Sequence, residues 1–428
     1  MISVNASFIF FSAIVFLGFI LNGLFSKTKI TNIIPLMIIG YLIGPIFGII
    51  NIGSGSIVAA VTPYFTALAI SFILFDVGLR IDFNKLKKLF LISTTFTLII
   101  TLIMGIIFAI LAYFIFGWSL IISLIFGFAI AGPSAIVIPT IVNMLNLSDN
   151  IKTLLIYESI ASDSVTLIFP LLLFGILFTG SLTSSTIVSN VVYILVGSID
   201  IAAVSALFWL YILKKFKSAR LDYGWMLTIA MVVATYGISQ QIGVSGTITI
   251  FIFGLLVANL GGVKSEVNES FFSKKFGIPD TIDHIRGYQK EIVFFASTFF
   301  FVYLGTLFNI TALNYSNLLL ILTAAIFCII MVPLRYVVAP ITNRLMSKEK
   351  GKHKTEKNVI SFSVARGLTV AVIATLTVTY GLNIPNFVNM MFLIIFFSNL
   401  IESIGIFFIY RKESKSQKDI THVQVSNA

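Results

Sequence analysis

The sequence predicts an all-α polytopic membrane protein with about thirteen transmembrane helices. Of its 428 residues, 58% are hydrophobic and only 11% are charged, whereas soluble domains contain about 45–50% apolar and about 25% charged residues. The apolar residues also gather in stretches of about 20, the length of helix that crosses roughly 30 Å of hydrocarbon. Finally, the basic residues alternate with these stretches in a regular way.

The apolar stretches define the predicted spans in order. The first lacks the basic start and the small-residue cleavage site of a signal peptide, so we expect it to remain as a span. The thirteen spans lie at residues 5–25, 31–50, 57–79, 89–116, 118–143, 153–180, 186–213, 222–242, 245–262, 288–310, 316–342, 358–381 and 386–410.

The basic residues predict the orientation of the chain. Every Lys and Arg except Arg335 and Arg366 follows an odd-numbered span or lies at the start of the next one, and the segments after even-numbered spans carry none. Because positive charge marks cytoplasmic loops, we expect the N-terminus outside and the C-terminus in the cytoplasm of a cell-membrane protein. The net charge of +11 is then a topology signal that also favours membrane lipid, and we expect no nucleic-acid partner.

The rest of the composition excludes several classes. Three His and one Cys are too few for a zinc ribbon, a disulfide scaffold or a CxxC redox site. The polar stretches at 263–287, 343–358 and 411–428 are too short for a core of their own. We therefore expect a single transmembrane domain over residues 1–428, ending in a short cytoplasmic tail at 411–428, with no cofactor.

Two spans carry residues that break helices. Span 5 contains Ala131, Gly132 and Pro133 at its middle, and span 12, seven spans later, contains Gly367 at its middle. Inverted repeats place broken helices at corresponding positions, and freed backbone at membrane depth lines a cavity. We expect two inverted six-helix repeats whose broken helices cross. The alternative is two ordinary helices loosened by glycine.

Seven ionisable residues lie within the spans, and each needs a partner, a proton or water there. They are Asp76, Glu158, Asp163, Asp200, Arg335, Arg366 and Glu402. Asp163 shares a helix face with Ser159, and Ser162 precedes it, so hard oxygen ligands converge near one carboxylate. Such a site suits either a proton or a small cation. A carboxylate neutralised by a fixed basic partner is the alternative.

The other carboxylates have structural interpretations. Glu158 lies about 140° around the helix from Asp163, so we expect it to form an ion pair with Arg366 that ties span 6 to the break in span 12. A direct transport role is the alternative. Asp76 either lines the inner entrance to the site or is an interfacial carboxylate near Arg80. For Arg335, Asp200 and Glu402 we favour structural pairing.

At these residues the chain resembles the monovalent cation/proton antiporters, most closely the archaeal and bacterial sodium/proton exchangers of the NhaP type. Residues 158–163 read Glu-Ser-Ile-Ala-Ser-Asp, where the family typically has Glu-Ser-Leu-Leu-Asn-Asp. Residues 365–367 read Ala-Arg-Gly against Leu-Arg-Gly, and residues 75–79 match Phe-Glu-Gly-Gly-Leu. Residues 298–305 match an aromatic run that ends in Leu-Gly. The resemblance covers nearly the whole chain.

The resemblance implies a homodimer with a core of spans 4–6 and 11–13. It also implies Asp163, Ser159 and Asp76 as cation ligands and Glu158–Arg366 as the ion pair. Three positions depart from the family pattern: Ala131-Gly132-Pro133 replaces Thr-Asp-Pro, Ser162 replaces Asn, and Ser297 replaces a basic residue. These departures concern selectivity and stoichiometry rather than the fold.

The predicted function is exchange of a monovalent cation, Na⁺ or Li⁺, for protons by alternating access, with cation and proton competing for Asp163. Ser159, Ser162 and Asp76 surround this site, and the loss of a second central carboxylate favours electroneutral exchange. A K⁺/H⁺ antiporter is the alternative. An intramembrane protease is remote because all three His lie outside the spans, so we predict no enzyme. A channel is equally remote, since no filter loop or ring of charge is present.

Overall fold

All regular secondary structure in the described part of the chain is helical. The computed structural model describes residues 12–21, 23, 33–48, 57–80, 90–135, 137–142, 145, 147–179, 184–216, 220–260, 279–308, 315–343 and 350–426. Six helices in these residues are long and apolar enough to cross a membrane, and five shorter ones are also apolar. A helix or a pair of helices lies in each of the thirteen predicted spans, which confirms the predicted fold class.

Among the described residues, the first seven spans contain one short apolar helix near the N-terminus and seven labelled α-helices. The short helix is Ser12–Leu21. The others are α2 (Ile33–Tyr41) with its continuation η1 (Leu42–Ile46), α3 (Ile57–Arg80), α4 (Phe90–Phe116), α5 (Leu120–Ala129), α6 (Val137–Val142), α7 (Asp149–Thr179) and α8 (Ser184–Lys215).

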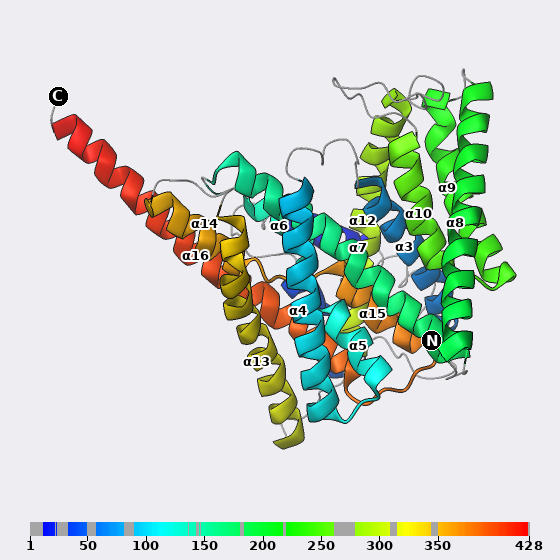
Figure 1. Cartoon of the computed structure of the whole chain (residues 1–428), viewed down its shortest axis with the longest axis horizontal. Helices are drawn as coiled ribbons and strands as arrows, with labels where there is room; N and C mark the ends of the chain where they lie inside the picture. Colours follow the sequence, from blue (N-terminus) through cyan, green and yellow to red (C-terminus); the bar gives the residue numbers. More distant parts are fainter. Residues whose placement is uncertain are drawn as a thin grey trace.

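The last six spans contain the remaining helices (Figure 1). They are α9 (Arg220–Ile242), α10 (Gly246–Leu260), α12 (Pro279–Leu307), α13 (Tyr315–Val338) with η2 (Ala339–Thr342), α14 (Lys350–Phe362), α15 (Leu368–Thr379) and α16 (Phe387–Ser426).

Two of the polar stretches outside the predicted spans are partly helical. The polar stretch 343–358 contains the start of α14, and the tail from residue 411 continues α16 to Ser426. Within α14, the buried carboxylate of Glu356 accepts a hydrogen bond of 2.9 Å from the backbone N–H of Ser148, just before α7. That contact holds the polar half of α14 against the bundle. In Figure 1 the C-terminal part of α16 projects away from the other helices.

The helices form two groups. In the first, which we call the panel, α3 packs on α10 and α12, α2 packs on α12, and α8 and α9 pack on α10. In the second, the core, α4, α5 and α7 pack on one another, and α13, α14 and α15 pack on α16. The core therefore contains spans 4–6 and 11–13, as the resemblance implied. Figure 1 shows α8, α9 and α10 on one side of the molecule and α13, α14 and α16 on the other.

Glycines allow very close packing within the panel. A Cβ atom on Gly78 of α3 would overlap the backbone of α10 at Phe251, and one on Gly254 of α10 would overlap the backbone of α3 at Phe75. Small residues of this kind are how membrane helices approach closely. The contact holds the part of α3 that carries Asp76 firmly against α10.

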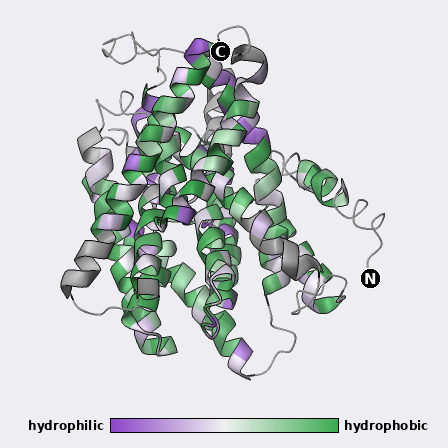
Figure 2. Cartoon of the chain, turned by 90° about the vertical axis from the view of Figure 1, so that its right-hand side faces the viewer, coloured by the Kyte–Doolittle hydropathy of each residue, from purple (hydrophilic) through white to green (hydrophobic). Residues whose placement is uncertain are grey.

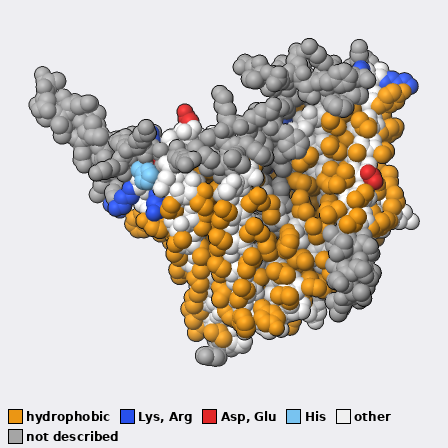
Figure 3. All heavy atoms as spheres, in the orientation of Figure 1, with side chains coloured by type: hydrophobic (Ala, Val, Ile, Leu, Met, Phe, Trp, Pro, Cys, Tyr) orange, Lys and Arg blue, Asp and Glu red, His pale blue; other side chains and the backbone are white. Residues whose placement is uncertain are grey.

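The surface agrees with a membrane environment. Hydrophobic side chains cover most of the flank visible in Figure 3, while Lys, Arg and His side chains lie along its upper margin. Figure 2 likewise shows hydrophobic residues over most of the helices, with hydrophilic ones gathered near the end where the C-terminus lies. The chain is a multi-pass membrane protein with an apolar belt.

Candidate functional site

The site is built around two broken helices that cross at the centre of the core. The segment between α5 and α6 and the segment 363–367 between α14 and α15 both leave the helical path. The Ser134 N–H donates a hydrogen bond of 2.8 Å to the Ala365 carbonyl. Gly367 lies so close to Ser134 that a Cβ atom would overlap its side chain. The breaks and their crossing are thus found at the predicted residues.

Side chains of α16 satisfy the backbone of the second break. The Ala365 N–H donates to the Glu402 carboxylate, and the Arg366 N–H donates to the Ser398 hydroxyl at 3.0 Å. The Asn399 amide donates to the Arg366 carbonyl at 2.6 Å. Unsatisfied backbone groups are costly at membrane depth. These contacts therefore make the break in span 12 sustainable and give Glu402 the structural role that we favoured.

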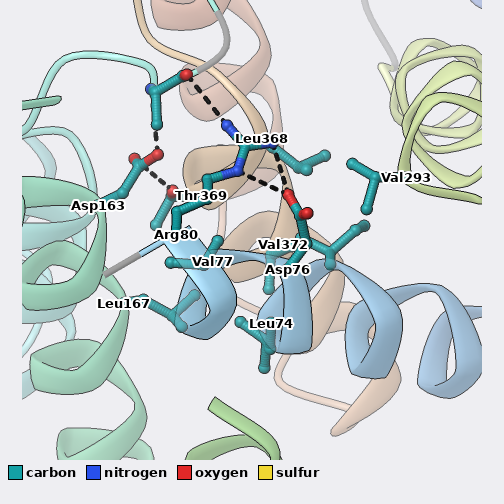
Figure 4. A pocket seen from close by; sticks show the side chains of 12 residues that line it. Leu74, Asp76, Val77, Arg80, Asp163, Leu167, Val293, Leu368, Thr369 and Val372 are labelled. Atoms are coloured by element: carbon teal, nitrogen blue, oxygen red, sulfur yellow. Dashed lines mark hydrogen bonds and ion pairs between the residues drawn. The ribbon is translucent and has the colours of Figure 1, made fainter. Parts of the chain in front are cut away.

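Asp163 of α7 lies where the two breaks meet. One carboxylate oxygen accepts a hydrogen bond of 3.1 Å from the Ala135 N–H, at the first break, and the other accepts one of 2.7 Å from the Thr369 hydroxyl. Thr369 is in the first turn of α15, so the carboxylate is close to the positive end of that helix. Figure 4 shows Asp163 and Thr369 pointing toward each other.

Asp76 of α3 is held by Arg80 one turn later. The Arg80 guanidinium donates to one Asp76 oxygen through Nε at 2.7 Å, and its Nη2 lies 2.5 Å from the same oxygen. Arg80 Nη1 also donates to the Ala135 carbonyl at 3.3 Å. In Figure 4 Arg80 lies between Asp76 and Asp163, and dashed contacts link the two carboxylates through it.

A small cavity separates the two carboxylates. Its volume is about 20 Å³, and a water molecule needs at least about 10–15 Å³, so it has room for one water or one largely dehydrated ion. Its polar lining comes from Asp76 and Arg80 of the panel and from Asp163 and Thr369 of the core. The remaining walls are Ala135 and the side chains of Ile73, Leu74, Val77, Leu167, Val293, Leu368 and Val372.

The two predicted serine ligands are buried beside this cavity but do not line it. The Ser159 hydroxyl donates to the Ile156 carbonyl at 2.9 Å, and the Ser162 hydroxyl donates to the Ser159 carbonyl at 3.3 Å. Gly132 packs directly on Ser162, because a Cβ atom there would lie 2.8 Å from both Cβ and Oγ of Ser162. Ala131, Gly132 and Pro133 are buried at the first break.

The predicted ion pair between Glu158 and Arg366 is wrong. Glu158 forms a two-pronged ion pair with Arg335 of α13, at 2.5 and 2.8 Å, and neither side chain is exposed. Arg335 also donates to the Ile360 carbonyl at 2.7 Å. Arg366 instead donates to the Ala131 carbonyl at 3.3 Å, across the crossing. The helical angle correctly turned Glu158 away from Asp163, but it could not identify the helix on that face.

Asp200 and Thr369 also differ from the sequence interpretation. Asp200, for which we favoured structural pairing, is exposed on the outer face of α8. Thr369 touches Asp163, yet we did not single it out as a ligand. The sequence feature that could have identified Thr369 is its position two residues after Gly367, because a hydroxyl in the first turn of a half-helix faces the break.

Comparisons with known proteins agree with this architecture. The family model for the transmembrane region of sodium/hydrogen exchangers matches residues 12–412. A structure of the sodium proton antiporter MjNhaP1 from Methanocaldococcus jannaschii at pH 8 has a TM-score of 0.67 and 18% identity, covering 94% of this chain and 95% of that one. An electron-microscopy structure of the same protein has a TM-score of 0.65 and 16% identity, covering 96% and 98%. At these identities the likeness concerns the fold. No curated protein sequence matches the chain significantly.

Proposed function

Since the chain belongs to the sodium/hydrogen exchanger family, we propose that it exchanges Na⁺ or Li⁺ for protons, with cation and proton competing for Asp163. The observation that carries this proposal is the position of Asp163. Its carboxylate lies at the meeting point of both breaks and lines a cavity of about 20 Å³. Its contacts there are a backbone N–H and a hydroxyl, both of which a bound cation can replace.

The charges around the breaks support a single exchanging carboxylate. Three other carboxylates near the breaks are matched in number by three guanidinium groups: Asp76, Glu158 and Glu402 by Arg80, Arg335 and Arg366. The negative charge of Asp163 is therefore the one in excess. A buried uncompensated charge is costly, so Asp163 takes up either a proton or a cation when it is enclosed. This balance supports electroneutral one-for-one exchange.

The cation-bound site needs oxygen ligands besides Asp163. The Thr369 hydroxyl is already at 2.7 Å from the carboxylate and lines the same cavity. We propose that Ser159, Ser162 and Asp76 complete the shell after local rearrangement, since both serine hydroxyls and one Asp76 oxygen are engaged elsewhere in this structure. Oxygen ligands of this kind suit hard monovalent cations.

Alternating access follows from the two helix groups. The cavity lies between α3 of the panel and α7 and α15 of the core. We propose that the core moves against the panel and exposes Asp163 to one side and then the other, only when Asp163 is neutralised. Because one site holds either ligand but never both, the two gradients are coupled.

The size of the cavity does not discriminate among the monovalent cations. About 20 Å³ accommodates one water-sized ligand, and a dehydrated K⁺ ion is about as large as a water molecule. K⁺/H⁺ exchange is therefore the alternative that the experiment below separates.

We further propose a cell-membrane protein that is a homodimer, with the N-terminus outside and a cytoplasmic C-terminal tail on one transmembrane domain. The exposed carboxylate of Asp200 lies on the apolar outer face of α8, where lipid tails solvate it poorly. A second copy covering this face would shield it. The mass of the purified protein in detergent tests the dimer.

The central test is proton flux in proteoliposomes that hold a pH gradient. Adding Na⁺ or Li⁺ to wild-type protein is expected to release the gradient, with a smaller response to K⁺. Asp163→Asn removes the charge that binds either ligand and is expected to abolish the response. A membrane-potential dye is expected to report no net charge movement.

Two controls make the result specific. Asp200→Asn removes an intramembrane carboxylate outside the site and is expected to keep the cation response. Size-exclusion chromatography checks that each variant is folded. An active Asp163→Asn protein, or a wild type that no cation activates, contradicts the proposal.

A further inference from the structure

We propose that Arg80 is an internal competitor of the transported cation for the Asp76 carboxylate, and that it thereby sets the apparent cation affinity of the site. This inference rests on the proposed function. In this proposal Arg80 lies on the panel, opposite Asp163, and determines the cation affinity by binding the Asp76 carboxylate.

The first observation in support is that Arg80 already binds the Asp76 carboxylate. The Arg80 guanidinium binds one Asp76 oxygen through two nitrogens, at 2.7 and 2.5 Å. Asp76 lines the same cavity as Asp163 and is the only other carboxylate in its lining among the described residues. A cation that binds this oxygen displaces Arg80, and a cation that binds the other Asp76 oxygen lies beside the guanidinium charge. The two positive charges therefore compete for Asp76.

The second observation in support is that the Arg80 side chain is partly exposed, whereas the backbone that carries it is fixed. Arg80 is the last residue of α3, and its side chain is 31% exposed, whereas that of Asp76 is 8% exposed. Gly78 packs directly on the backbone of α10, which holds the end of α3 in place. The guanidinium can therefore leave for solvent while Asp76 stays at the cavity.

The third support is a connection to Asp163. Arg80 Nη1 donates to the Ala135 carbonyl at 3.3 Å, and the Ala135 N–H donates to Asp163 at 3.1 Å. Arg80 thus bridges the panel and the first break of the core (Figure 4). Withdrawal of Arg80 releases both Asp76 and this bridge, which links cation entry to the part of the core that has to move.

The expected size of the effect follows from the population of the competent state. If Arg80 is withdrawn in about a tenth of the molecules, the apparent cation affinity is about tenfold weaker than that of the open site. Removing the guanidinium is then expected to lower the half-maximal cation concentration by about the same factor.

The experiment measures the half-maximal Na⁺ concentration for proton exchange in proteoliposomes containing Arg80→Gln, Asp76→Asn or both. Arg80→Gln is expected to lower it about tenfold. Asp76→Asn is expected to raise it, because the unpaired guanidinium then competes at Asp163. The double variant is expected to return close to wild type.

Two matched variants separate charge from other effects. Arg80→Lys keeps the positive charge and is expected to resemble wild type. Arg286 of α12 donates to the Leu79 carbonyl at 3.2 Å, so Arg286→Gln removes a guanidinium beside the same end of α3 without touching Asp76. This variant is expected to leave the half-maximal concentration unchanged. If Arg80→Gln cannot be purified, the comparison of Arg80→Lys, Asp76→Asn and the double variant still tests the charge pair.

Three results would overturn the inference. The first is an unchanged half-maximal concentration in Arg80→Gln. The second is a double variant as weak as Asp76→Asn alone, which makes Asp76 a simple ligand and Arg80 irrelevant. The third is an Arg80→Lys protein that behaves like Arg80→Gln. Cation-driven proton flux in wild type that Asp163→Asn abolishes shows that the proposed function stands even when these tests fail. If the wild type shows no cation-driven proton flux, the proposed function itself is contradicted, and this inference is contradicted with it.

Discussion

The Glu158–Arg335 pair joins α7 to α13 with two charges that are fully removed from solvent. The Nε–H of Arg335 donates a hydrogen bond to the Ile360 carbonyl near the end of α14. One guanidinium therefore fixes the positions of two helices relative to α7. A buried pair is weak evidence of net stabilisation, but breaking it leaves a bare charge in an apolar core.

Removal of one partner is expected to be severe. Glu158→Gln leaves the Arg335 charge unpaired and is expected to cost about 3–5 kcal/mol of stability. Adding Arg335→Met removes that charge and is expected to recover much of the loss. The measurement is thermal unfolding of the purified protein in detergent. Arg366→Met added to Glu158→Gln serves as the matched control and is expected to give no recovery. Recovery by Arg366→Met instead would restore the original pairing hypothesis.

Two of the three departures from the family pattern lie against each other. Gly132, where the family has Asp, packs on Ser162, where the family has Asn. A larger residue at 132 has no space, because a Cβ atom there would also lie 3.0 Å from the Thr166 methyl group. The two departures therefore lie at a single packing contact.

At the scale of elements, the break in span 12 depends on α16. Residues 363–367 are not helical, and α15 starts only at Leu368. Glu402, Ser398 and Asn399 bind the exposed backbone of this segment. Their contacts position Thr369 in the first turn of α15, against Asp163. The geometry of the proposed site is therefore set by α16, a helix that does not line the cavity.

Truncation of Glu402 tests this dependence. Glu402→Ala leaves the Ala365 N–H without its acceptor, which is expected to cost about 1–3 kcal/mol. It is also expected to reduce the rate of exchange by displacing Thr369. Glu402→Gln retains an acceptor oxygen and is expected to be milder on both counts. Thermal unfolding and proton flux measure the two effects, with Ser403→Ala as the control on the same helix. Equal effects of the Ala and Gln variants would contradict a role in accepting this hydrogen bond.

At the scale of the whole molecule, the site lies on the boundary between two helix groups. Asp76 and Arg80 belong to the panel, whereas Asp163 and Thr369 belong to the core. In the proposed mechanism, movement of one group against the other changes the ligand shell and the access path together.

A reversible link between the groups is expected to stop transport. Val77 of α3 and Leu368 of α15 line the same cavity from opposite groups. With Cys328→Ala in the background, a reducible thiol cross-linker between Val77→Cys and Leu368→Cys is expected to abolish exchange, and reduction is expected to restore it. The control link joins Tyr193→Cys to Ile242→Cys within the panel, where Tyr193 donates to the Ile242 carbonyl at 3.2 Å. Exchange that survives the Val77–Leu368 link would argue against relative movement of the groups.

The membrane fold, the thirteen spans, the two breaks and the presence of a carboxylate beside them could all be predicted from the sequence alone. These features depend on local quantities: the length of apolar runs, Gly and Pro within a span, and the high cost of a charge in hydrocarbon. The orientation from the basic residues and the inverted repeats remain predictions. Asp163 could be singled out because few residues at membrane depth carry a charge at all.

Which charges meet, in contrast, depends on how the helices pack. Glu158 binds Arg335 rather than Arg366, Arg80 binds Asp76, and Thr369 reaches Asp163. Each contact except that of Arg80 joins residues that are far apart in the chain, so it depends on which helix packs on which face. The Arg80–Asp76 pair is one turn apart, but its place at the cavity depends on α3 meeting the first break. Helical periodicity gives a direction for each side chain, and packing alone supplies its partner.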